Sequence, residues 1–116
     1  MRPETRRIIA IEVHRRRSGR CPTMIHALGT GESFRIEPCR NGFTDLETDL
    51  RVRSDADRIL LPETSIEIRL GADVGFSATD LGSGETITGR AGGGSSVTVY
   101  DQDEYYQYAV VNEHGL

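Results

Sequence analysis

The chain has 116 residues, of which 36% are hydrophobic and 28% charged, and its formal net charge is −4. A chain of this length buries roughly two-thirds of the surface that its unfolded form exposes, so it folds without disulfide bonds or metals, and intrinsic disorder is excluded. The apolar runs are too short for a signal peptide or a membrane helix. We therefore expect a cytoplasmic protein without membrane association, in which Cys21 and Cys39 are reduced thiols.

The first apolar segment covers residues 8–14 and alternates in the manner of a strand. Ile9, Ile11 and Val13 fall on one face, and His14 falls on the opposite face, which we expect to be exposed to solvent. Three arginines and a Ser-Gly pair follow at residues 15–19 and predict a turn. The pattern therefore predicts a first strand here, preceded by a frayed tail.

The next part of the chain predicts three strands separated by glycine turns, over 23–28, 33–37 and 46–53. The third of these has the strictest alternation, because apolar Leu50 and Val52 alternate with charged residues. Asp45, Glu47 and Asp49 would then line the solvent face of this strand. Such a row of carboxylates is typical of a solvated sheet face with cross-strand ion pairs.

The remainder of the chain predicts a meander of short strands. Residues 58–62 fit either a short strand or one helical turn, and their neighbours favour a strand. The following segments alternate with period two between glycine-rich or acidic turns, at 66–70, 74–81, 85–91, 95–100 and 105–111. Short strands at regular spacing without intervening helices predict an all-β antiparallel sandwich or small barrel of about eight or nine strands, with residues 1–116 as one domain. Residues 1–5 and 112–116 are expected to be frayed tails.

All basic residues are arginines, and their distribution along the chain is uneven. The first 20 residues carry seven arginines and two glutamates, whereas the other 96 carry seven arginines and 16 carboxylates. Arg15, Arg16 and Arg17 form the densest basic segment, which could contact the phosphates of a nucleic acid or a protein partner. Pairing with the chain's own carboxylates and protection of an edge strand are the alternatives.

Four residues could form a tetrahedral metal site with two nitrogen and two sulfur ligands: His14, Cys21, His26 and Cys39. Their spacing lacks the close pairs of structural zinc sites, so we predict no metal and no cofactor. The same residues are the only candidates for a thiol enzyme, because Arg20 and the two histidines could lower the pKa of Cys21. No known nucleophile motif accompanies them, and we predict no catalytic residue.

The four tyrosines concentrate at the last predicted hairpin. They are Tyr100, Tyr105, Tyr106 and Tyr108, and the turn between the strands contains Asp101 and Asp103. Strand alternation places Tyr106 and Tyr108 on one face and Tyr105 on the other, so at least one tyrosine faces away from the core. Tyrosine is enriched at protein interfaces, although cross-strand packing would explain the cluster as well.

These features favour a non-enzymatic protein-binding or assembly module. The expected contact residues are the four tyrosines with Asp101 and Asp103, together with the basic segment 15–17, in contact with a protein partner or a second copy of the chain. Nucleic-acid binding through the arginines is the first alternative. A metal or thiol enzyme built on the histidine and cysteine set is the second.

Overall fold

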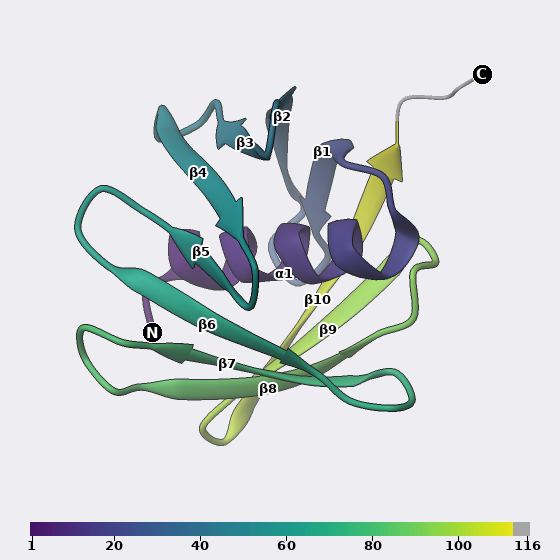
Figure 1. Cartoon of the computed structure of the whole chain (residues 1–116). Coiled ribbons are helices and arrows are strands. Elements are labelled where there is room, and N and C mark those ends of the chain that lie inside the picture. Colours follow the sequence, from purple (N-terminus) through teal and green to yellow (C-terminus); the bar gives the residue numbers. More distant parts are fainter. Residues whose placement is uncertain (113–116) are drawn as a thin grey trace.

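In a computed structural model, which describes residues 1–112, ten antiparallel strands close into a barrel around a single helix. The helix α1 (Pro3–Ser18) precedes all strands and runs through the lumen (Figure 1). The strands are β1 (Pro22–Ala27), β2 (Glu32–Cys39), β3 (Gly42–Asp45), β4 (Leu50–Asp55), β5 (Arg58–Leu60), β6 (Ser65–Leu70), β7 (Gly75–Asp80), β8 (Thr86–Ala91), β9 (Ser96–Asp101) and β10 (Glu104–Asn112). Each strand pairs with its neighbours in sequence, and β1 also pairs with β10. The predicted all-β fold is confirmed, and of the two expected forms, sandwich or small barrel, the chain adopts the barrel, with ten strands instead of eight or nine.

The first predicted strand is wrong, because residues 8–14 belong to α1. Nine residues between Thr5 and His14 are buried, and they point in all directions around the helix axis. A helix that is surrounded by protein carries apolar side chains on every side, so it lacks the stripe that distinguishes a helix from a strand. Thr5, expected in a frayed tail, is buried within this helix. Residues 113–116 of the predicted C-terminal tail lie outside the described residues.

The ends of α1 carry local signals for a helix. Pro3 occupies the first turn, where its missing N–H and fixed φ are favourable, and Glu4 interacts favourably with the helix dipole. Three arginines occupy the last turn, and Gly19 ends the helix in the left-handed conformation (φ 75°). The Gly19 N–H donates to the Arg15 carbonyl oxygen at 2.9 Å. These capping residues, and not hydrophobic periodicity, were the sequence signal for a helix.

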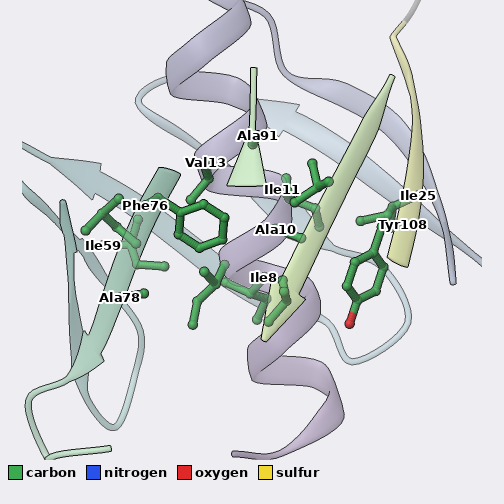
Figure 2. Packing of buried hydrophobic residues seen from close by; sticks show 14 of the residues in the cluster. Ile8, Ala10, Ile11, Val13, Ile25, Ile59, Phe76, Ala78, Ala91 and Tyr108 are labelled. Atoms are coloured by element: carbon green, nitrogen blue, oxygen red, sulfur yellow. The ribbon is translucent and has the colours of Figure 1, made fainter. Parts of the chain in front are cut away.

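The core lies between α1 and the inner faces of the strands. Figure 2 shows side chains of α1 facing those of the barrel wall, namely Ile8, Ala10, Ile11 and Val13 against Ile25, Ile59, Phe76, Ala78, Ala91 and Tyr108. All ten side chains are at most 5% exposed. Burial of an aliphatic side chain of this size contributes about 1.5–3 kcal/mol to folding, so the helix supplies a large share of the core.

The strand predicted over residues 46–53 is wrong in its first half, because β4 begins only at Leu50. Residues 46–49 form the turn between β3 and β4, with Asp49 at a positive φ of 58°. Asp45 and Asp49 therefore do not share a strand face. Asp45 points into the barrel, is fully buried and forms an ion pair with Arg7 of α1. The Arg7 guanidinium also stacks on Phe34, 3.9 Å from the ring centroid.

We expect Asp45→Asn to lower the free energy of unfolding by about 3–5 kcal/mol, because it leaves the buried charge of Arg7 without a counter-ion. Urea unfolding followed by circular dichroism measures the change. Asp49→Asn, at an exposed position of the same turn, is the matched control and should change stability by less than about 0.5 kcal/mol. Equal stabilities of the two variants would contradict a buried Arg7–Asp45 pair.

Gly89→Ala should destabilise the barrel by about 2 kcal/mol or more, because β8 lies against β9 and Phe76 at this position. A Cβ atom on Gly89 would lie 2.2 Å from the Thr98 carbonyl oxygen and 2.4 Å from the Phe76 ring. The control is Gly94→Ala, where no atom lies within 4 Å of the added methyl group. Thermal unfolding compares the two variants, and a Gly89→Ala protein as stable as Gly94→Ala would refute this packing.

Candidate protein-binding face

The histidine and cysteine residues do not converge on one site. His14, expected on a solvent face, is 1% exposed inside the barrel, where its Nε2 lies 3.1 Å from Asn112 Oδ1. His26 lies on the outside of β1 and contacts the Ser33 hydroxyl at 2.7 Å. Within residues 1–112, no three histidine, cysteine, aspartate or glutamate side chains are placed to hold a metal ion.

Cys21 and Cys39 are free thiols that line one pocket beside the end of α1. Burial raises the pKa of the Cys21 thiol to about 11, and the nearby charge of Arg15 only partly opposes this shift. A nucleophilic cysteine needs a lowered pKa, which Arg20 and the two histidines were expected to favour. The environment of Cys21 has the opposite effect, so the geometry does not favour a thiol enzyme.

The guanidinium groups of the basic segment bind the rest of the chain. Arg16 binds the buried Glu12 carboxylate at 2.7 Å and donates to the Ala56 and Arg58 carbonyl oxygens at 2.6 and 3.1 Å. The Arg17 guanidinium donates to the carbonyl oxygens of Gly71, just after β6, and of Gly75, the first residue of β7. Arg15 lies 3.5 Å from Glu12. These contacts attach the end of α1 to the barrel. The alternative of intramolecular pairing therefore describes this segment better than an edge patch does.

The tyrosine hairpin consists of β9 and β10, and the two strands present their tyrosines on different faces. Tyr108 points into the barrel and is 5% exposed, whereas Tyr105 points outward and is 64% exposed. Tyr100 of β9 pairs directly with Tyr105, and their ring centroids are 6.4 Å apart. The predicted alternation along β10 is confirmed, and one side of the hairpin presents two exposed rings.

Tyr106 is half-buried at the end of the barrel, between a cation and an anion. The Arg6 guanidinium lies 3.9 Å from the centroid of its ring, and its hydroxyl donates to Glu104 at 2.9 Å. This hydrogen bond raises the pKa of Tyr106, whereas burial raises that of Tyr108. Both rings therefore remain neutral at physiological pH and hold the base of the hairpin in place.

Asp101 has a structural role that the sequence did not indicate. Its side chain is buried and binds both Arg6 and the Met1 amino group at 3.2 Å. Asp103 and Glu104 in the same turn are exposed, and they form no ion pair with any described residue. Of the carboxylates at this turn, Asp103 and Glu104 are therefore the ones accessible to a partner.

A groove lies between the tyrosine hairpin and the β1–β2 turn. It has a volume of about 300 Å³ and is lined by residues 27–30 and 105–108. Its walls include Leu28, which is 56% exposed, and Tyr105. The Leu28 N–H donates to the Gln107 carbonyl oxygen at 2.9 Å, which fixes the turn against β10. Leu28 is the last residue of the strand predicted over 23–28, and the sequence did not indicate that it lies near the tyrosines. The pairing of β1 with β10 brings the two together.

The outer face around this groove carries little charge. Cross-strand pairing aligns two rows of outward residues, which are Thr88, Tyr100 and Tyr105 in one row and Arg90, Thr98 and Gln107 in the next. Ser96, Ala109, His26 and Ser33 continue this face across β10 and β1 to β2. Tyrosine, serine and small polar side chains dominate antibody combining sites, because they give contact area and hydrogen bonds at low entropic cost. We call this surface the tyrosine face.

The partial burial of Cys21 is testable by alkylation. In a Cys39→Ser variant, iodoacetamide should modify Cys21 at pH 8 about 100-fold more slowly than it modifies a cysteine in an unstructured peptide, because the pKa of about 11 leaves few thiolates. The rate should rise steeply up to about pH 11, as followed by mass spectrometry. The urea-unfolded variant provides the control and should react at the peptide rate. Peptide-like reactivity of the folded variant would contradict the burial.

Comparisons with known proteins identify no relative of this chain. The sequence matches no protein-family model, and no curated protein or solved structure is significantly similar to the chain. The α1 helix of the described residues is neither long nor apolar enough to cross a membrane. A functional interpretation therefore depends on the tyrosine face and the groove beside it.

Proposed function

We propose that this protein is a non-enzymatic, cytoplasmic protein-binding module that recognises a basic segment of a partner protein through the tyrosine face. The observation that carries the proposal is the groove between Leu28 and Tyr105, which brings these two exposed side chains together. A leucine or aromatic side chain of the partner would fill the groove. A neighbouring arginine or lysine would approach the acidic turn.

The charges around the groove support a basic partner. Asp103 and Glu104 directly precede Tyr105 in the chain, at the β9–β10 turn, and the exposed Glu32 follows the β1–β2 turn. None of the three carboxylates forms an ion pair with a described residue. Complementary charge at the rim of an interface accelerates association and selects partners, whereas the aromatic centre supplies most of the affinity.

The closed barrel also favours recognition by side chains. Each of the ten strands has two paired neighbours, so the described residues offer no free strand edge. Addition of a peptide as an extra strand, which is common in open sheets, is therefore unfavourable here. Self-association of two copies of the chain through an edge strand is unfavourable for the same reason.

Nucleic-acid binding through the basic segment 15–17 is the alternative that we favour less. Arg16 and Arg17 would have to give up hydrogen bonds to backbone carbonyl oxygens before they could contact phosphates. Loss of these bonds would release the contacts that attach the end of α1 to the barrel, which is unfavourable.

A labelled octapeptide of alternating arginine and leucine tests the proposal by fluorescence anisotropy. We expect binding that weakens with salt, and Tyr105→Ala should reduce the affinity at least tenfold, because truncation of a central interface tyrosine typically costs about 2 kcal/mol. Leu70→Ala is the matched control, because it removes an exposed apolar side chain from another part of the barrel. Thermal unfolding should show that both variants fold.

Two comparisons make the test specific. A peptide of alternating arginine and glycine should bind more weakly, because it lacks a side chain for the groove, and one of alternating glutamate and leucine should not bind. Equal affinity for the arginine–glycine peptide, or for Tyr105→Ala and wild type, would contradict the proposal. Binding of single-stranded DNA that disappears in Arg15→Ala/Arg17→Ala would favour the nucleic-acid alternative instead.

A further inference from the structure

A second pocket lies at one open end of the barrel, beside the beginning of α1. Figure 1 shows the N-terminus at this end, next to the β7–β8 connection. The pocket has a volume of about 320 Å³, at the lower end of the range for small-molecule sites. Its lining comes from the start of α1 and from the β3–β4, β5–β6 and β7–β8 connections.

One side of this pocket is apolar. Four side chains form it, namely Ile8, Leu50, Leu61 and Pro62. Ile8 is 1% exposed and belongs to the core, so the pocket ends on the packed interior of the barrel. Apolar surface of this kind binds a hydrocarbon or aromatic group and releases water from the wall.

The polar side of the pocket is negatively charged. Four carboxylates line it, namely Glu4, Glu63, Asp80 and Glu85, against two cations, Arg2 and the Met1 amino group. The two cations already have partners, because the amino group lies 3.1 Å from Glu85 and Arg2 lies 3.7 Å from Glu4. Glu63 and Asp80 form no ion pair with a described residue. Glu63 and Asp80 therefore account for the excess negative charge in the pocket.

Asp80 is held in place and ionised. Burial raises its pKa, but hydrogen bonds from the Thr64 hydroxyl and from the Gly82 and Ser83 N–H groups outweigh this effect and lower the pKa below its ordinary value. These three donors share Oδ1, at 2.7 Å for Thr64 and 2.9 Å for Gly82. Oδ2 accepts no hydrogen bond from the described residues and remains available to a ligand.

The hydroxyl of Thr5 is a second, independent feature of the pocket. Thr5 is 8% exposed, lines the pocket, and makes no side-chain hydrogen bond with any described residue. Its hydroxyl oxygen is not fully buried, so it is accessible from the pocket. A ligand or water in the pocket would supply a hydrogen-bond partner.

From the apolar wall, the unpaired carboxylates and the Thr5 hydroxyl together, we infer that this pocket binds a small organic cation, namely a primary amine on an aromatic or branched aliphatic body. The ammonium group binds Asp80 Oδ2 and Glu63, and the body lies against Leu50 and Leu61. A polar substituent on the body reaches the Thr5 hydroxyl. The site is separate from the tyrosine face and does not depend on the proposed partner.

Phenethylamine, 2-phenylethanol and 3-phenylpropionate are matched probes with an ammonium, a hydroxyl and a carboxylate group on similar bodies. Titration of the full chain, with any tag at the C-terminus because Met1 lines the pocket, is followed by ¹H–¹⁵N NMR. We expect phenethylamine to shift the amide signals of Thr5, Leu61 and Thr64 and to bind at least tenfold more tightly than the other two. The site is overturned if the three probes bind equally, or if none shifts these signals.

Variants separate a specific site from general attraction of cations to an acidic protein. Glu63→Gln and Asp80→Asn should each weaken phenethylamine binding about fivefold to tenfold. Asp73→Asn should leave it unchanged, because Asp73 similarly accepts an N–H bond within its own loop, from Gly75, but lies outside the pocket. Thr5→Val should remove any preference for 2-amino-1-phenylethanol over phenethylamine. Equal weakening by Asp73→Asn and Glu63→Gln would reduce the effect to non-specific electrostatics and overturn the proposal.

Discussion

The structure depends on the insertion of α1 into the barrel. Eight strands form a barrel whose interior is just filled by their own side chains, and wider barrels leave space inside. With ten strands, the lumen requires additional apolar volume, which Ile8, Ile9, Ile11 and Val13 of α1 provide. Helix and barrel are therefore one folding unit: without the helix the inner faces of the strands would be exposed, and without the strands the helix would be exposed on every side.

Polar side chains on α1 determine how the helix sits in the lumen. Arg7, Glu12 and His14 are buried, and each finds its partner on the barrel wall, in Asp45, Ser54 and Asn112 respectively. Apolar packing tolerates small rotations, but a buried charge without its partner is strongly unfavourable. The three contacts lie along the helix, so they select one rotation and one depth of insertion. This selection also positions Arg6, which holds Asp101 and stacks on Tyr106 at the base of the tyrosine face.

The filled lumen has a consequence for function. Barrels that bind ligands commonly do so inside, whereas here the helix occupies the space where such a ligand would lie. The surfaces that remain are the outside of the barrel and its open ends. The tyrosine face lies on the outside, and the pocket with Asp80 lies at one end, so both proposed sites are at positions that the helix leaves free.

The sequence by itself determined the strands from β6 onward, the turns between them, and the alternation that turns Tyr105 outward and Tyr108 inward. These features follow from alternating side chains and from glycines in turns, and both can be recognised from residues adjacent in the sequence. The capping residues of α1 are a local signal for the helix, although the alternation of residues 8–14 conceals it. Only the tertiary structure decided that Asp45 is buried, that Arg16 and Arg17 are bound within the chain, and that Leu28 meets Tyr105. Each of these features depends on a partner more than 30 residues away in the sequence. A helix that such partners surround on every side has no apolar stripe, so its sequence lacks the periodic pattern of an amphipathic helix.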